Sequence, residues 1–261
     1  MNLQLENKRA LVSGSTAGIG FAIAEALARE GAPVIVNGRT QARVDEALKK
    51  LKGAKNAEGL AADLGTAAGV LQAIERYPEV DILVNNLGIF EAKPFQEITD
   101  QDWMRFFEVN VLSGVRLSRH YLPGMKRRNW GRIVFISSES AVQIPSEMIH
   151  YGMTKTAQVA VARGLAETTT GTNVTVNTVL PGPTASEGVT GFLDQMAAKE
   201  KTDKATIERE FFTSVRPSSL LKRFTTPEEV AALVAFVCSP LSSATNGAAL
   251  RADGGVVRAI L

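Results

Sequence analysis

A chain of 261 residues with a hydrophobic content of 45% can bury the core of one large α/β domain or of two small ones. The formal net charge of +2 gives no reason to expect a nucleic acid or an anionic membrane as the main partner. The single cysteine, Cys238, excludes an intrachain disulfide, and neither it nor the two histidines form a ligand pattern for a metal ion.

No linker of low complexity or high charge divides the chain, and we therefore expect one domain. The segment from Met1 to Arg9 is polar and charged and lacks the apolar region of a signal peptide. No segment has the unbroken apolar length that spans a bilayer. These features predict a soluble protein of a reducing compartment, the cytoplasm.

Short apolar runs alternate with longer amphipathic segments along the chain. Runs that are buried on both faces are typical of parallel strands. Strands are expected at residues 10–13, 33–37, 59–62, 82–85, 133–136, 174–179 and 248–251. Helices are expected at residues 19–30, 40–51, 66–77, 100–126, 151–170 and 227–238. This alternation predicts an α/β fold with a doubly wound parallel sheet and right-handed crossovers.

A glycine-rich turn follows the first expected strand and opens the first expected helix. Gly14, Gly18 and Gly20 have the spacing Gly-x-x-x-Gly-x-Gly. Because these positions lack side chains, the backbone can approach a pyrophosphate, and the helix N-terminus supplies unpaired N–H groups to hold it. We therefore expect a dinucleotide cofactor here. The expected contacts in the turn are Gly14, Ser15, Thr16, Gly18, Ile19 and Gly20.

Four polar residues further along the chain indicate proton transfer. Tyr151 and Lys155 lie one helical turn apart, with Ser138 and Asn110 upstream. A phenol has a pKa of about 10 in a model peptide, and a lysine ammonium on the same helix face favours the phenolate and lowers that pKa. Tyr151 could then exchange a proton with a substrate oxygen. Each motif is common by itself, but their order and spacing together indicate hydride chemistry.

These motifs resemble those of the classical short-chain dehydrogenase/reductase family over essentially the full chain, and are similar to those of its 3-oxoacyl-(acyl-carrier-protein) reductase-like members. The resemblance implies a Rossmann-like fold with a seven-stranded sheet. It implies that Tyr151 is the general acid in reduction and the base in oxidation, while Lys155 lowers the pKa of the phenol and holds the nicotinamide ribose.

The resemblance assigns roles to the two upstream residues as well. Ser138 would hydrogen-bond the substrate oxygen and polarise the carbonyl. Among three clustered serines it is the one with the family's thirteen-residue separation from Tyr151. Asn110 would kink the long helix at 100–126 and hold a water that relays protons to Lys155. Ser137 is expected to face the strand packing, and Ser140 the pocket wall.

The end of the second strand predicts which dinucleotide is used. In the family a carboxylate there grips the ribose of NAD, and a following basic residue grips the 2′-phosphate of NADP. Here the matching pair is Gly38 and Arg39, with Arg43 one turn further, so NADP(H) is favoured over NAD(H). The other cofactor contacts that the resemblance implies are Asp63, Leu64, Asn86, Gly88, Tyr151, Lys155, Pro181, Gly182 and Thr184.

The implied activity is that of an NADP(H)-dependent oxidoreductase, which transfers hydride between nicotinamide and a carbonyl or secondary alcohol. A reductase of 3-oxoacyl thioesters on acyl carrier protein is an alternative. The basic segment 126–128 favours it, whereas Asn129 and Thr172 stand where charge is wanted. An inactive cofactor-binding protein is an alternative of another class, against which the intact proton-transfer residues argue.

The segment 185–226 interrupts the strand-helix alternation. It contains two amphipathic pieces, at 190–199 and 204–214, and the second carries Phe211 and Phe212. An insertion after the sixth strand stands at the carboxyl edge of the sheet, where open α/β sheets bind ligands. We therefore expect a lid over the substrate, with a subunit contact as the alternative.

Assembly is also implied by the resemblance, since members form dimers and tetramers through the fourth and fifth helices. Here the helix with Tyr151 offers a stripe of small residues, Ala157, Ala160 and Gly164, that permits close packing. The expectation is a homotetramer. Use of the same stripe inside a monomer is the alternative.

Overall fold

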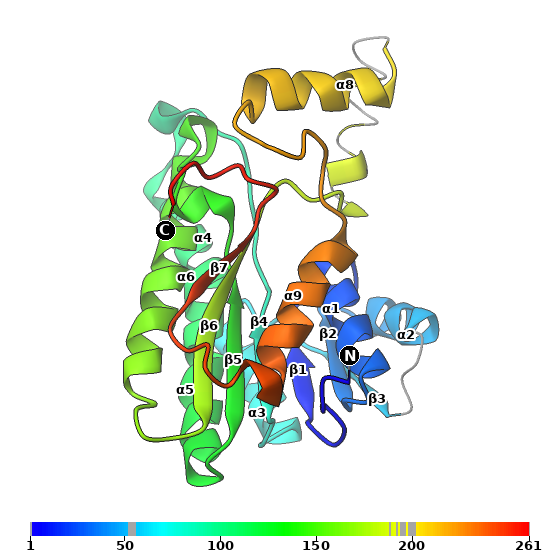
Figure 1. Cartoon of the computed structure of the whole chain (residues 1–261), viewed down its shortest axis with the longest axis vertical. Helices are drawn as coiled ribbons and strands as arrows, with labels where there is room; N and C mark the ends of the chain where they lie inside the picture. Colours follow the sequence, from blue (N-terminus) through cyan, green and yellow to red (C-terminus); the bar gives the residue numbers. More distant parts are fainter. Residues whose placement is uncertain are drawn as a thin grey trace.

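Seven strands form one parallel sheet at the centre of the molecule (Figure 1). The computed structural model describes residues 2–51, 56–187, 189–191, 193, 197 and 202–260. The strand order is β3-β2-β1-β4-β5-β6-β7, and the chain reverses its winding direction between β1 and β4, as in a doubly wound sheet. The strands are β1 (Ala10–Val12), β2 (Val34–Gly38), β3 (Ala57–Ala61), β4 (Ile82–Asn85), β5 (Gly131–Ile136), β6 (Val174–Pro181) and β7 (Ala249–Ala252).

Helices cover both faces of the sheet. The α-helices are α1 (Gly18–Arg29), α2 (Gln41–Lys50), α3 (Ala67–Arg76), α4 (Asp100–Phe107), α5 (Ser113–Arg127), α6 (Ile149–Glu167), α8 (Lys204–Glu210) and α9 (Pro227–Cys238). Short 3₁₀ turns are η1 (Phe95–Glu97), η3 (Glu139–Ala141), η4 (Ser146–Met148) and η6 (Pro240–Ser242). Single π-helical turns are η2 (Glu108–Leu112) and η5 (Phe211–Val215).

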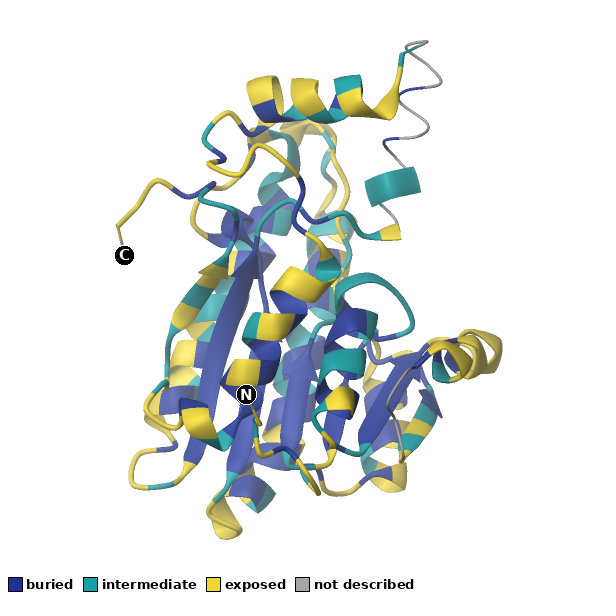
Figure 2. Cartoon of the chain, turned by 45° about the vertical axis from the view of Figure 1, so that its right-hand side comes forward, coloured by how far each residue is buried: buried dark blue, intermediate teal, exposed yellow. Residues whose placement is uncertain are grey.

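The alternation of side chains along each strand divides the core into two layers. In β1, Ala10 and Val12 pack with α1 and α9, whereas Leu11 packs on the opposite face with α3, α5 and α6. Both layers exclude solvent, and Figure 2 shows the strands buried while the outer faces of the helices are exposed. Because both faces are buried, the strands read as continuous apolar runs, which confirms the expected sheet.

The helix expected over 100–126 is interrupted at Asn110, the residue at which the family resemblance implies a kink. The structure has α4, the π-helical turn η2 and then α5. The cause lies in tertiary contacts of Asn110, whose side chain bonds the backbone of Ile89 and whose carbonyl oxygen accepts from Gln158 Nε2 at 2.7 Å. The wider turn places the Asn110 side chain toward the carboxyl edge of the sheet.

The insertion after β6 has a small core of its own. Phe212 and Phe224 are buried and lie 5.0 Å apart between ring centroids, and Ile207 of α8 packs with them. The second amphipathic piece expected at 204–214 corresponds to α8 and η5. The piece expected at 190–199 lies largely outside the described residues. In Figure 1, α8 stands beyond the upper end of the sheet, where β6 ends.

No helix in the described part of the chain is long and apolar enough to cross a membrane.

A close approach between α5 and the sheet depends on one glycine. A methyl group on Gly114 would lie 2.6 Å from Phe135 Cε1 and 3.2 Å from Asn85 Cγ. We expect Gly114→Ala to lower the free energy of unfolding by about 1–3 kcal/mol, because this interior has no room to expand. Urea unfolding measures the change.

The matched control lies in the same helix. A methyl group on Gly124 would meet only the guanidinium ends of Arg128 and Arg127, at 3.2 and 3.7 Å, and no backbone or core atom. Gly124→Ala is expected to stabilise the protein by up to about 1 kcal/mol through helix propensity. Equal unfolding midpoints for the two variants would show that α5 does not need glycine at position 114.

Candidate active site

The glycine turn between β1 and α1 has the backbone conformation that glycine requires. Gly14 and Gly18 have φ angles of +60° and +56°, in the left-handed region. A Cβ atom on Gly20 would lie 2.4 Å from both Gly14 O and Asn86 Nδ2. Helix α1 begins without a capping side chain from Ala17, so its first N–H groups are open to a ligand. An anion held by backbone N–H groups fits this turn.

Two asparagines from neighbouring strands brace the turn. Asn37 Oδ1 accepts from Gly14 N at 3.0 Å, and its Nδ2 donates to two carbonyl oxygens at the end of β3. Asn86 Nδ2 donates to Ser13 O at 2.9 Å and to Gly14 O at 3.0 Å. The Asn86 amide therefore faces the backbone of the turn. Sequence reasoning missed Asn37, although a buried polar residue inside an apolar strand is a detectable signal.

A cavity of about 410 Å³ opens beside the turn. Its size and its lining of backbone, apolar and cationic groups suit the adenosine half of a dinucleotide. Of the expected cofactor contacts, Gly14, Thr16, Arg39, Asp63 and Leu64 line it. The remaining lining residues are Asn37, Gly38, Thr40, Arg43, Ala62 and Leu87.

The other expected contacts have different surroundings. Ser15 is fully buried, and its hydroxyl donates to Val12 O at 2.7 Å, so its side chain supports the turn. Gly88 lies beside the catalytic cluster, since a Cβ atom there would be 3.4 Å from Lys155 Nζ. Pro181 and Gly182 end β6, where Thr184 is buried and its hydroxyl donates to Gly182 O at 2.9 Å. Ile19 is partly buried in the first turn of α1.

The structure brings the four expected catalytic residues to one end of the sheet. Ser138 follows β5, Tyr151 and Lys155 lie on α6, and Asn110 lies in η2. Lys155 Nζ donates to Ile136 O at 3.0 Å and is 5.5 Å from the centroid of the Tyr151 ring. Asn110 Nδ2 donates to Thr154 Oγ1 at 3.0 Å, which connects η2 to α6.

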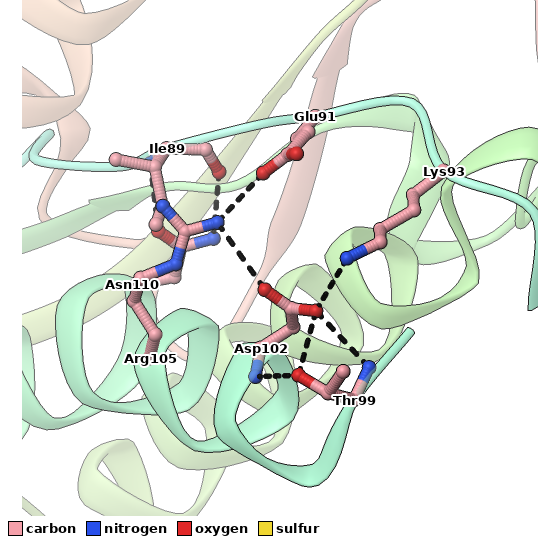
Figure 3. A network of polar contacts seen from close by, with 7 residues as sticks. All are labelled: Ile89, Glu91, Lys93, Thr99, Asp102, Arg105 and Asn110. Carbon is pink, nitrogen blue, oxygen red and sulfur yellow. Dashed lines mark hydrogen bonds and ion pairs between the residues drawn. The ribbon is translucent and has the colours of Figure 1, made fainter. Parts of the chain in front are cut away.

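Asn110 is held by a loop that ion pairs fasten to α4, and Figure 3 shows both sets of contacts. Ile89 N donates to Asn110 Oδ1 at 2.8 Å. Further along the loop, Lys93 pairs with Asp102 at 2.7 Å and Glu91 pairs with Arg105 at 2.6 Å. The Glu91–Arg105 pair is exposed and the Lys93–Asp102 pair is partly buried, so each adds little stability singly, but together they fix the course of the loop that positions the Asn110 amide.

Burial dominates the acid-base properties of the Tyr–Lys pair. It raises the pKa of the Tyr151 phenol well above its usual value, and the Glu139 carboxylate raises it further. A hydrogen bond with Ser138 and the charge of Arg216 act in the opposite direction. Burial lowers the pKa of Lys155 to about 8, against the effect of Glu139. The net shift of the phenol is thus opposite to the one expected from the Tyr–Lys spacing alone.

A buried ion pair beside Ser138 is the feature that sequence reasoning missed. Glu139 is 5% exposed, and its carboxylate accepts from the Ser138 hydroxyl and from Arg216 Nε at 3.2 Å. The sequence motifs assigned no part in proton transfer to either Glu139 or Arg216. The two residues are 77 positions apart, and no local pattern connects them.

The neighbouring serines and His150 have packing roles. Ser137 donates to Lys155 O at 2.8 Å and is buried, as expected, while Ser140 N donates to Ser138 Oγ at 3.1 Å. His150 is fully buried, with its ring centroid 4.1 Å from that of Phe106. Among the residues that the structure describes, no group of three or more His, Cys, Asp or Glu side chains could hold a metal ion.

Comparison with known proteins agrees with this arrangement. The sequence profile described as short chain dehydrogenase matches residues 8–197. The chain therefore belongs to the short chain dehydrogenase family, and its class is that of an oxidoreductase.

Three relatives show how far the similarity extends. The chain is 52% identical to the uncharacterized oxidoreductase YvaG of Bacillus subtilis (strain 168), with 100% of both chains covered. It is 34% identical to the 3-oxoacyl-(acyl-carrier-protein) reductase FabG of Aquifex aeolicus (strain VF5), covering 98% of this chain and 100% of that one. The structure of L-sorbose reductase from Gluconobacter frateurii, complexed with NADPH and L-sorbose, matches with a TM-score of 0.93, 31% identity and 100% coverage of both chains.

Proposed function

We propose that this protein is an NADP(H)-dependent oxidoreductase that transfers hydride between nicotinamide and a carbonyl or secondary alcohol. The observation that carries the proposal is the convergence of Ser138, Tyr151 and Lys155 at the carboxyl edge of the sheet, next to the braced glycine turn. A protein that only bound the cofactor would need the turn and a group such as Lys155 to hold the ribose, but it would not need the proton-transfer hydroxyls of Ser138 and Tyr151.

The chain's own residues would move and hold the proton. Tyr151 donates it to the substrate oxygen in reduction and removes it in oxidation. The Ser138 hydroxyl turns from Glu139 to the substrate oxygen and stabilises its developing charge. Lys155, next to Gly88, holds the nicotinamide ribose, and Asn110 positions a water that relays protons to it. The nicotinamide supplies or accepts the hydride when it is bound.

The preference for NADP(H) rests on the cations at the end of β2. Arg39 and Arg43 are exposed and line the cavity beside the glycine turn, where a guanidinium can bind a 2′-phosphate through two N–H groups. Gly38 takes the place of the acid that would repel this phosphate. The NADPH complex of L-sorbose reductase supports the same choice.

A hydroxylated ketone is the substrate class with the most support. The charged groups of Glu139, Glu147 and Arg216 lie near Ser138, and such groups can exchange hydrogen bonds with hydroxyls. The similarity to L-sorbose reductase points the same way. Similarity to FabG makes a 3-oxoacyl thioester the second class. Lys126, one of the basic residues that could bind the carrier protein, already donates a hydrogen bond to Thr168 O.

A substrate panel tests the proposal. With NADPH, we expect the purified protein to reduce L-sorbose or a similar hydroxylated ketone more efficiently than an N-acetylcysteamine thioester of a 3-oxoacyl group, followed by the loss of NADPH absorbance. Tyr151→Phe is the matched control, because any reduction that does not depend on the proposed site would persist in this variant. Preferential reduction of the thioester would instead favour the FabG-like activity. Binding of NADPH without turnover of any ketone or thioester would favour the inactive cofactor-binding protein.

Two further properties belong to the proposal. The segment 185–226 of this single domain would cover the substrate, because α8 stands beyond the carboxyl end of the sheet. The functional unit would be a homotetramer in the cytoplasm, and Ala160 and Gly164 are exposed on α6, where a second subunit could approach closely.

A further inference from the structure

A buried ion pair joins the insertion to the loop that carries the catalytic serine. Glu139 lies in η3, directly after Ser138, and Arg216 follows η5 at the end of the insertion's helical part. Both oxygens of the carboxylate are engaged, Oε2 by the Ser138 hydroxyl and Oε1 by Arg216 Nε. Because a buried charge without a partner is costly, each member of the pair depends on the other.

The position of Arg216 is fixed by the fold of the insertion. Its backbone N–H donates to Phe211 O at 2.9 Å, and its Nη1 donates to Val215 O at 3.0 Å. The side chain is 11% exposed and also reaches Glu147 Oε1 at 3.3 Å. Phe212, in the same turn, is buried in the insertion's own core. The contact between the guanidinium and Glu139 therefore depends on how the insertion folds against the loop that follows β5.

The pair also sets the charge around Tyr151. Three charged side chains from different elements face the phenol: Lys155 of α6, Glu139 of η3 and Arg216 of the insertion. The carboxylate disfavours the phenolate, whereas the guanidinium offsets that effect. Glu147 of η4 acts through Arg216, to which it is bonded. An unpaired Glu139 would leave a negative charge beside the group that must ionise during oxidation.

We propose that Arg216 is a positioning residue that connects the insertion to proton transfer, by fixing the Glu139 carboxylate next to Ser138 and neutralising its charge beside Tyr151. This inference rests on the proposed function and deepens it, because it assigns the insertion a part in the acid-base step as well as in covering the substrate. Without the contact to Arg216, the Glu139 carboxylate would be unpaired beside Tyr151, and the site would be less able to form the phenolate.

Opposite shifts in the pH profile are the expected result. Alcohol oxidation needs the phenolate, so its rate rises with pH until Tyr151 has ionised. Glu139→Gln removes the negative charge, lowers the pKa of the phenol and moves this rise to lower pH. Arg216→Met leaves the carboxylate unpaired and moves the rise to higher pH. Each displacement is expected to be about one pH unit, and the double variant should return close to the wild-type profile.

The controls separate this role from simple support of the fold. Arg216→Lys keeps the charge and should restore most of the wild-type profile. Arg209→Met removes an exposed cation from α8 that bonds only within the insertion, to Thr206, and should leave the profile unchanged. A loss of rate without displacement of the profile, in both Glu139→Gln and Arg216→Met, would overturn the proposal. If Arg216→Met does not fold, Glu139→Gln and Arg216→Lys carry the same test.

A second readout does not depend on activity. The chain has three tyrosines, so the ¹³C-labelled phenol carbon of Tyr151 can be assigned by its absence in Tyr151→Phe and titrated by NMR. Ionisation should begin at lower pH in Glu139→Gln and at higher pH in Arg216→Met than in the wild type. Identical Tyr151 titration in all variants would overturn the inference. If the titrations differ but no alcohol is oxidised, the proposed function fails while the charge coupling stands.

Discussion

Replacement of Tyr151 by phenylalanine is expected to reduce turnover by at least about 100-fold, the usual contribution of a positioned acid-base group, and to leave NADPH affinity close to that of the wild type. The ring keeps its packing against Phe90, which lies 6.4 Å away between centroids, so only the proton donor is lost. Steady-state kinetics and a fluorescence titration with NADPH measure the two quantities.

Tyr121→Phe is the matched control for this change. The Tyr121 hydroxyl donates to Tyr77 O at 2.8 Å in the core, away from the cleft. Its loss should cost about 1 kcal/mol of stability and leave kcat unchanged. A Tyr151→Phe enzyme with more than about a few per cent of wild-type activity would contradict the role of the phenol as general acid, since such groups contribute at least about 100-fold.

The second large effect concerns the choice of cofactor. Arg39→Ala should weaken NADPH binding by about 1.5–3 kcal/mol, the usual contribution of a hydrogen bond to a charged group, and leave NADH binding nearly unchanged. Dissociation constants for both cofactors measure this difference. Lys49→Ala removes an exposed cation from the far end of α2 and should affect neither cofactor. Equal losses for NADPH and NADH would mean that Arg39 only packs against adenine.

A change of cofactor preference from NADPH to NADH requires a third substitution besides those at Gly38 and Arg39, and the sequence does not reveal it. An aspartate at Gly38 would repel the 2′-phosphate and accept the ribose hydroxyls of NADH. However, its Cβ would lie 2.5 Å from Thr16 Cγ2 and 3.4 Å from Thr16 Oγ1. Thr16→Ser removes the clashing methyl and keeps the hydroxyl. We expect the triple variant, Thr16→Ser with Gly38→Asp and Arg39→Ala, to prefer NADH, whereas Gly38→Asp without Thr16→Ser should also lose stability.

The fold was predictable because its signals are local. Short apolar runs identified all seven strands, although the edge strands β3 and β7 are only partly buried, and the periodic segments between the runs identified the helices, including α6, which carries Tyr151 and Lys155. The break at η2 was not predictable in detail, because contacts of Asn110 with Ile89 and Gln158 widen the turn. Those partners lie 21 and 48 positions away in the sequence.

The candidate site shows the same difference between local motifs, which the sequence reveals, and long-range contacts, which it does not. Motif spacing singled out Ser138, Tyr151 and Lys155, which the structure brings to one end of the sheet. It did not reveal that burial and the Glu139 carboxylate raise the pKa of the phenol, because desolvation depends on what the whole chain packs around Tyr151. Nor could it pair Glu139 with Arg216, since the contact exists only after the insertion has folded against the loop that follows β5.

The two asparagines that brace the glycine turn have a thermodynamic consequence. Asn37 and Asn86 hold the backbone of Gly14 from two different strands, so the turn is already ordered before any ligand arrives. Fixing the backbone of each residue costs roughly 1–2 kcal/mol in conformational entropy. In this protein that entropy is lost once, when the chain folds, and not again at each binding event. The attraction between the turn and a pyrophosphate can therefore be expressed as affinity with little ordering cost to offset it.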